Sequence, residues 1–206
     1  ESLISSFETL YTWGRSPHQS NNQLFKIENN FLLCKTYEEQ NGLIAVAIHN
    51  RSVDMLLGWI NSKIKTVSLY KKIKINVLEK FVKKNREYGE SKSYETSIGG
   101  VRKIFQALKS KGAICFAADQ VPQRGLGKYI KLYNRDAYTT TLVQSLAVKT
   151  RAPVLYIFIN SNKNGFLYVS VKQCENDIYD DSKHLLLLNK DIENIINVRP
   201  IDYSWE

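Results

Sequence analysis

The stretch 42–60 holds a histidine and an acid at a spacing that could support acid–base chemistry. An apolar run over 43–48 ends at His49, and Asp54 follows five residues later, just before a second apolar run. A carboxylate that holds a histidine in place turns it into a general base of fixed orientation. In one continuous helix these two side chains would diverge by roughly 140° and could not pair. We therefore predict a strand ending before His49, a turn, and a helix with Asp54 in its first turn.

The elements that must position these residues alternate along the chain. Short β-rich runs predict strands, and apolar residues at helical spacing predict helices. The expected strands cover residues 24–27, 31–34, 43–48, 65–70, 113–118, 129–133, 154–160 and 166–172, the last two joined by a turn at 162–165. The expected helices cover 2–14, 35–41, 54–60, 75–87, 99–111, 139–149 and 181–198. This alternation predicts an α/β fold with a mixed, mainly parallel central sheet flanked by helices.

Polar side chains follow three of the predicted strands. His49 follows the strand at 43–48, Lys71 follows the run that ends in Tyr70, and the pair Asp119 and Gln120 follows the strand at 113–118. Ligands of such sheets gather at the carboxyl ends of the strands. The sequence therefore predicts that these side chains converge on one edge as an active site.

Composition limits the class of protein and its partners. The 206 residues carry a net charge of +9 and are 43% hydrophobic, which suits one folded domain over 1–206. The positive charge favours an acidic partner, such as nucleic acid, anionic lipid, a phosphorylated sugar or an acidic protein. No recognition helix or basic, aromatic sheet face is evident, so we do not expect nucleic-acid binding.

The chain ends and the cysteines add two expectations. No run reaches the ~18 apolar residues that a membrane span needs. Because the chain begins at Glu1, we expect a fragment that lacks an N-terminal membrane anchor. The three cysteines form no CxxC pair, which favours free thiols in a reducing compartment.

Other catalytic motifs are missing from the sequence. There is no GxSxG, and no cysteine is placed with a histidine as a nucleophile would require. His18, His49 and His184 lie far apart without HExxH spacing, so we expect no metal, and no GxGxxG or Walker loop indicates a cofactor. What remains is base-assisted attack of a substrate hydroxyl on an activated carbonyl or phosphoryl group.

The order of the motifs resembles a known family. A hydrophobic strand followed by His-x4-Asp is similar to the glycerolipid-type acyltransferase superfamily, and the downstream segments resemble its late (secondary) lipid A acyltransferases of the lauroyl and myristoyl type. Ala118-Asp119-Gln120 resembles P-D-Q, and 132–140 (L-Y-N-R-D-A-Y-T-T) resembles F-F-G-R-P-A-x-T-T. The segments 100–112, 146–154 and 192–205 resemble further family segments in the same order.

The resemblance implies a reaction, its partners and a site. The reaction is O-acyl transfer from acyl carrier protein, as co-substrate and without another cofactor, to a hydroxyl of a lipid A precursor, at the cytoplasmic face of the bacterial inner membrane. His49, oriented by Asp54, would deprotonate that hydroxyl for direct attack, without an acyl-enzyme. The residues implied in substrate binding are Lys71, Asp119, Gln120 and Arg135, and the basic helix face implied for the acidic carrier protein includes Lys72, Lys74, Lys80, Lys83 and Lys84.

The sequence also departs from the family pattern. The family has H-x-G-N-W-E around the base, whereas residues 50–53 here read N-R-S-V and Asp54 stands in the place of Glu. Lys71 stands where the family has arginine and lacks the bidentate geometry of a guanidinium. Two alternatives therefore stay open, an acyltransferase of the same superfamily on another glycolipid or glycerolipid, and a degenerate paralogue of reduced activity.

Overall fold

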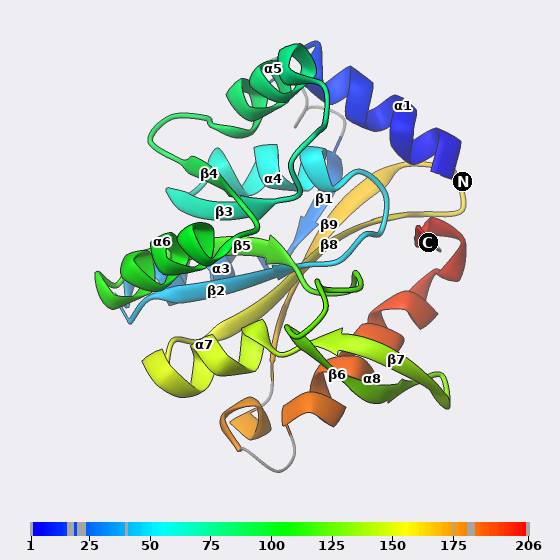
Figure 1. Ribbon diagram of the computed structural model, residues 1–206. Helices are drawn as coiled ribbons and strands as arrows, with labels where there is room; N and C mark the ends of the chain where they lie inside the picture. The colour runs from blue at the N-terminus through cyan, green and yellow to red at the C-terminus, as the bar shows by residue number, and fades with distance from the viewer. Residues whose placement is uncertain are drawn as a thin grey trace.

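A central sheet of seven strands forms the middle layer of the molecule (Figure 1). The structure is a computed structural model that describes residues 2–15, 19, 24–39, 41–174, 176–180 and 184–204. The strand order is β1-β9-β8-β2-β5-β3-β4. The bounds are β1 Leu24–Glu28, β2 Leu43–Ala47, β3 Thr66–Tyr70, β4 Lys92–Glu95, β5 Ala113–Ala117, β8 Val154–Ser161 and β9 Leu167–Gln173.

The sheet is mixed but mainly parallel. Strands β8, β2, β5, β3 and β4 run in the same direction, whereas β9 runs antiparallel to β8 and parallel to β1. This confirms the predicted α/β fold with a mainly parallel central sheet and the predicted late hairpin of β8 and β9. The carboxyl ends of five parallel strands consequently meet at one edge, where a site was expected.

Helices cover both faces of the sheet, because the central strands bury both of theirs. On β2, Ile44 and Val46 pack with α6 (Ile98–Lys109), α7 (Leu142–Thr150) and α8 (His184–Val198). Leu43 and Ala45, which point to the other face, pack with α3 (Asn30–Glu38) and α4 (Val53–Asn61). Outside this layer, α1 (Ser2–Trp13) packs on α4, and α5 (Asn76–Arg86) also contacts α4 (Figure 1). Within the described residues, no helix is both long and apolar enough to cross a membrane.

A separate hairpin, β6 (Gly127–Leu132) and β7 (Arg135–Thr140), corrects one prediction. The sequence predicted a helix from Thr139, but β7 extends to Thr140 and α7 begins only at Leu142. The two strands of the hairpin are joined by a turn at Tyr133–Asn134. Both turn residues have positive φ angles, 48° and 60°, which suit a two-residue hairpin turn. The backbone N–H of Tyr133 donates to Glu193 of α8 at 2.6 Å, so the hairpin is held against that helix.

Two other elements differ from the sequence prediction. The run 31–34, predicted as a strand, belongs to α3, and only Leu33 of this run is fully buried. A four-residue apolar run does not by itself distinguish a strand from one face of a helix. The short edge strand β4 was not predicted, because its sequence K-S-Y-E has little hydrophobic patterning. The interpretation of 1–206 as one domain stays a prediction.

Candidate active site

His49 and Asp119 lie together because β2 and β5 are parallel neighbours. Ala47 pairs with Ala117 at the ends of the two strands, and each site residue comes two positions later. The Nδ1 of His49 lies 2.7 Å from Oδ1 of Asp119, and the backbone N–H of His49 donates to Oδ2 at 2.7 Å. The Asp119 side chain is fully buried, whereas that of His49 is 22% exposed. A buried carboxylate thus fixes the orientation of the His49 ring through its Nδ1.

Asp54 has a different partner from the one that the sequence predicted. Ser52 caps α4 by accepting a hydrogen bond from the N–H of Met55, which places Asp54 in the first turn as expected. There its carboxylate accepts from Arg86 of α5, with Nε at 2.5 Å and Nη2 at 3.1 Å. Burial alone would lower the pKa of Arg86, but the hydrogen bond and charge of Asp54 raise it overall. The structure therefore pairs His49 with Asp119 and Asp54 with Arg86, where the sequence predicted a pair of His49 and Asp54.

Tyr70 connects this ion pair to the end of β3. The Arg86 guanidinium lies 5.4 Å from the centre of the Tyr70 ring, and the Tyr70 hydroxyl donates to Glu79. Burial raises the pKa of Tyr70, and its bond to Glu79 raises it further, so the phenol stays neutral. Lys71 directly follows β3 and is exposed.

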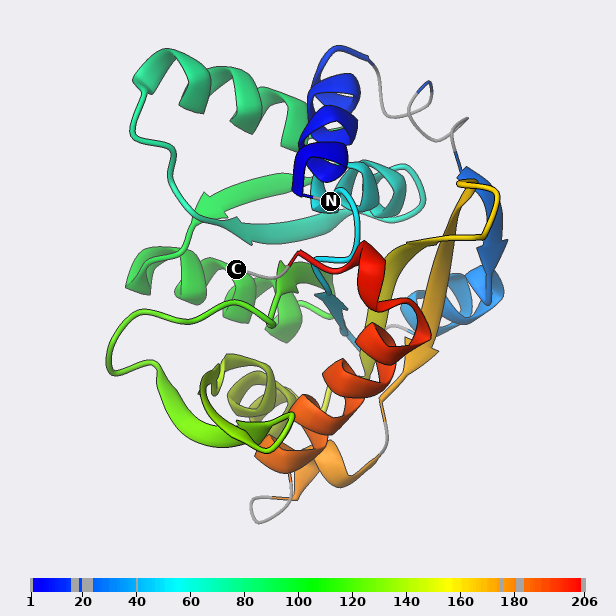
Figure 2. The ribbon, with the colours of Figure 1, turned by 90° about the vertical axis from the view of Figure 1, so that its right-hand side faces the viewer.

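The loop from His49 to Ser52 is held by the first helix and by the end of the chain. Arg51, in the left-handed region at φ 58°, donates to Glu8 of α1 and, at 3.4 Å, to Asp202. Burial raises the pKa of Glu8, although Arg51 opposes the shift. Figures 1 and 2 place the C-terminal segment beside the start of α1, where both can reach this loop. Arg51 therefore anchors the loop between His49 and α4.

Two further contacts complete the support of His49. The N–H of Ser204 donates to the carbonyl of His49 at 2.9 Å, and the Nδ2 of Asn50 donates to Oδ1 of Asn160 at 2.7 Å. Both asparagine side chains are fully buried, and Asn160 lies on β8, the other neighbour of β2. Sequence reasoning missed Glu8, Asn160 and Asp202, because no motif in the sequence relates them to His49.

The other predicted site residues, Gln120 and Arg135, lie in different parts of the structure. Gln120 directly follows Asp119 and is exposed at the same sheet edge. Arg135 is exposed at the turn end of the β6–β7 hairpin, and among the described residues no contact relates it to His49. Its role in holding acceptor phosphate stays a prediction.

The site has the groups of a general-base enzyme. Burial raises the pKa of the Cys115 thiol to about 12, so this cysteine on β5 is not a nucleophile at neutral pH. In the part of the chain that the structure describes, no three potential ligands gather as a metal site. A histidine that is hydrogen-bonded to a buried carboxylate at the carboxyl ends of parallel strands is suited to deprotonating a hydroxyl.

Comparison with known families decides the class of protein. The family model of the bacterial lipid A biosynthesis acyltransferases matches residues 3–205, nearly the whole chain. The chain belongs to this family. Its reaction is therefore acyl transfer in lipid A biosynthesis, with a lipid A precursor as the acceptor. A search of curated proteins finds no match to this chain.

Proposed function

We propose that this lipid A acyltransferase uses His49 as the general base, oriented by Asp119, and takes the acyl chain from a carrier-protein thioester. The observation that carries the proposal is the contact of 2.7 Å between Nδ1 of His49 and Oδ1 of Asp119. This contact favours the tautomer with the proton on Nδ1, in which Nε2 carries the lone pair that a general base needs.

The transfer then needs no acyl-enzyme. Nε2 of His49 takes the proton of the acceptor hydroxyl while the oxygen attacks the thioester carbonyl. The tetrahedral intermediate collapses with cleavage of the C–S bond, and the imidazolium returns its proton to the leaving thiolate. Asp119 stabilises the imidazolium that exists between these two proton transfers.

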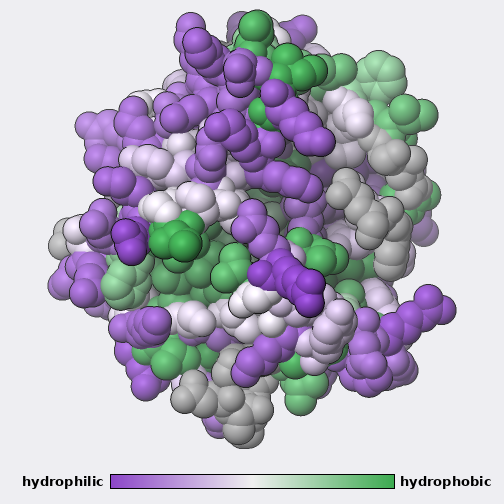
Figure 3. Space-filling model, viewed as in Figure 1, coloured by the Kyte–Doolittle hydropathy of each residue, from purple (hydrophilic) through white to green (hydrophobic). Residues whose placement is uncertain are grey.

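The substrate groups would approach from the same edge of the sheet. Lys71 is exposed beside the pair and supplies a cation for an acceptor phosphate. Ile98 and Val121, at 76% and 77% exposed, follow β4 and β5 at this edge and offer apolar surface to an acyl chain. Figure 3 shows hydrophobic side chains in the region of α6 below the hydrophilic surface of α5.

The exposed side of α5 supplies a docking surface for an acidic carrier protein. Lys80, Lys83 and Lys84 line a hollow of about 300 Å³ together with Lys92, against one acid, Glu87. Lys72 is less available because it pairs with Glu95 at 2.8 Å. Complementary charge of this kind mainly speeds association and selects the partner.

Association with the membrane surface is supported by α1. Leu3, Phe7 and Leu10 lie on one side of this helix and are 72%, 69% and 59% exposed, whereas Glu8 and Thr9 face the His49 loop. An apolar stripe that faces outward suits insertion into a lipid interface. The acceptor, a lipid, would then reach the site from the membrane surface.

The test is His49→Gln, assayed with acyl carrier protein loaded with a fatty acid and a lipid A precursor. We expect at least a ~100-fold loss of transfer, the typical contribution of a general base. Lys163→Gln, an exposed change in the β8–β9 turn, is the control. Transfer that survives His49→Gln would exclude the mechanism. Mass spectrometry of lipids from a deletion strain identifies the acceptor by the species that loses a chain, which separates lipid A from another glycolipid.

A further inference from the structure

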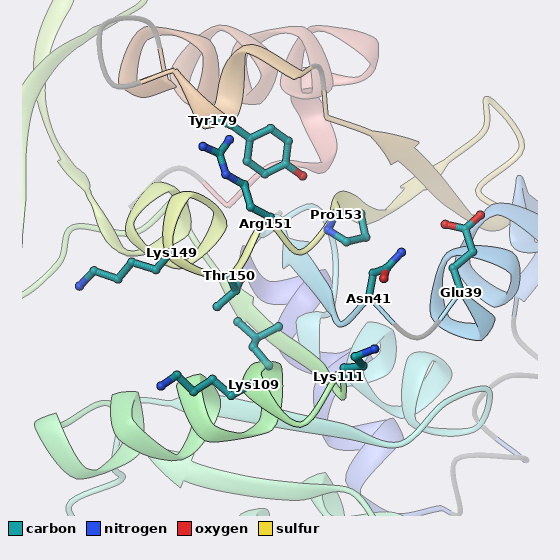
Figure 4. A pocket seen from close by; sticks show the side chains of 10 residues that line it. Glu39, Asn41, Lys109, Lys111, Lys149, Thr150, Arg151, Pro153 and Tyr179 are labelled. Atoms are coloured by element: carbon teal, nitrogen blue, oxygen red, sulfur yellow. The ribbon is translucent and has the colours of Figure 1, made fainter.

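A basic cleft lies at the opposite edge of the sheet from His49. Its volume is about 570 Å³, and it opens where β2, β5 and β8 begin (Figure 4). Asn41, Lys111 and Pro153 precede these three strands and line the cleft, with the ends of α6 and α7 on one side. This volume is within the range of small-molecule sites. Because the strands run between the two edges, a ligand here would not touch the acyl-transfer site.

The charge of the cleft is strongly one-sided. Four of its lining residues are cations, Lys109, Lys111, Lys149 and Arg151, and Glu39 is its one acid. None of the four forms an ion pair with another described residue. Elsewhere on the surface, Lys26, Lys65, Lys72 and Lys131 do pair with acids. The residues that line the cleft therefore carry a net charge of about +3, which no ion pair among the described residues neutralises.

Two of these cations are positioned by aromatic rings. The Arg151 guanidinium lies 5.6 Å from the ring centre of Tyr179, and the hydroxyl of Tyr179 donates to the carbonyl of Ala152 at 3.0 Å. The Nζ of Lys109 lies 5.0 Å from the ring centre of Phe105. Figure 4 shows Arg151 beside Tyr179 at one end of the cleft. Contact with a ring orients a cation but leaves its charge available to a ligand.

The backbone at Arg151 is a second unusual feature. Arg151 ends α7 in the left-handed region, at φ 57°, a position that glycine usually occupies. A side chain costs about 1 kcal/mol or more in this conformation. A strained residue that persists is a reason to ask what its side chain does. Here the conformation carries the guanidinium to the cleft.

Stabilisation of the helix ends does not account for all four cations. Lys109 and Lys149 lie in the last turns of α6 and α7, where a positive charge offsets the helix dipole. Arg151 is the C-cap residue of α7, and Lys111 lies two residues past the end of α6. A helix dipole leaves only about half a negative charge at its C-terminus, which one cation already offsets, so the second cation at each end is not needed for helix stability.

We propose that this cleft is a binding site for a ligand that carries phosphate groups, separate from the acyl-transfer site. Several cations around 570 Å³ suit a group with more than one negative charge better than a single carboxylate. The ligand's phosphates would lie among the lysines, and Arg151 would offer paired donors. The proposal does not depend on the mechanism at His49.

The experiment measures binding of inorganic pyrophosphate to the whole chain by titration calorimetry at low salt. The test variant is Arg151→Gly with Lys109→Gln, which removes two cleft charges and relieves the left-handed strain. Its matched control, Lys128→Gln with Lys163→Gln, removes two exposed charges outside the cleft. A second arm measures binding to vesicles that contain phosphatidylglycerol, which separates a lipid headgroup from a free phosphate.

We expect the cleft variant to bind pyrophosphate at least ~10-fold more weakly and the control to bind within about twofold of the parent. Vesicle binding that falls only in the cleft variant would also support the site and would assign it to a lipid headgroup. Equal losses in the cleft variant and the control would overturn the proposal, because the binding would then follow net charge alone. Absence of binding in both arms would also overturn it.

Discussion

Replacing Asp119 by asparagine separates its role from that of Asp54. The Asp119 carboxylate accepts two hydrogen bonds of 2.7 Å from His49, one from the backbone and one at Nδ1. Asparagine keeps the shape but loses the charge and one acceptor. If its NH₂ group faces the ring, it favours the tautomer with the proton on Nε2, and this tautomer cannot take the proton of a hydroxyl.

The geometry sets the size of the effect. A hydrogen bond to a charged group contributes about 1.5–3 kcal/mol, which corresponds to roughly 10–150-fold in rate. The wrong tautomer adds to this loss, as the ~10⁴-fold fall measured for the matching change in a serine-protease triad indicates. We therefore expect kcat to fall by roughly 10²–10⁴-fold, with KM nearly unchanged because the carboxylate is fully buried and bonded to His49.

Asp54→Asn is the comparison, because Asp54 neutralises Arg86 in a pair that is 11% and 19% exposed. Removing one partner of such a pair costs about 3 kcal/mol of folding free energy, so the urea midpoint of Asp54→Asn should fall. Its kcat per folded molecule should stay within about tenfold of the parent enzyme. The assay is single-turnover acyl transfer, with folding followed by circular dichroism. An active Asp119→Asn enzyme, together with a folded but inactive Asp54→Asn enzyme, would refute our assignment.

Three further predictions concern stability. Asp202→Asn should lower the free energy of unfolding in urea by about 2–4 kcal/mol, because this buried carboxylate accepts from the N–H and hydroxyl of Ser161 and from Arg51. An unchanged urea midpoint would contradict this stabilising role of Asp202. Gly100→Ala should lower the melting temperature strongly, because a Cβ there would lie 2.0 Å from the carbonyl oxygen of Glu95. Gly99→Ala, whose Cβ would meet only Oγ of Ser97 at an ordinary contact of 3.6 Å, should be neutral or stabilising by up to ~1 kcal/mol. Burial raises the pKa of Tyr156 far above its ordinary value of 10, so the folded state holds this proton and its stability falls as pH rises above ~10. In Tyr156→Phe, this alkaline loss should be smaller by about 1.4 kcal/mol in total between pH 9 and 11 in urea titrations, and parallel curves would contradict the burial argument.

The protein's class and most of its elements follow from local sequence. Alternating apolar runs predicted the strands and helices of the mainly parallel sheet, because hydrophobic periodicity is a property of neighbouring residues. The motif order predicted the acyltransferase family, which the match over residues 3–205 confirms. The position of His49 directly after a buried strand was also readable from the sequence, since the apolar run ends abruptly there.

Which carboxylate meets His49 was decided only by the tertiary structure. Asp54 is five residues away in sequence but turns with α4 toward Arg86, whereas Asp119 is 70 residues away and adjacent in space. The reason is the pairing of β2 with β5, in which matching strand ends carry their next residues to the same edge. Local patterns predict that a strand exists and not which strand lies beside it, so long-range pairing chose Asp119.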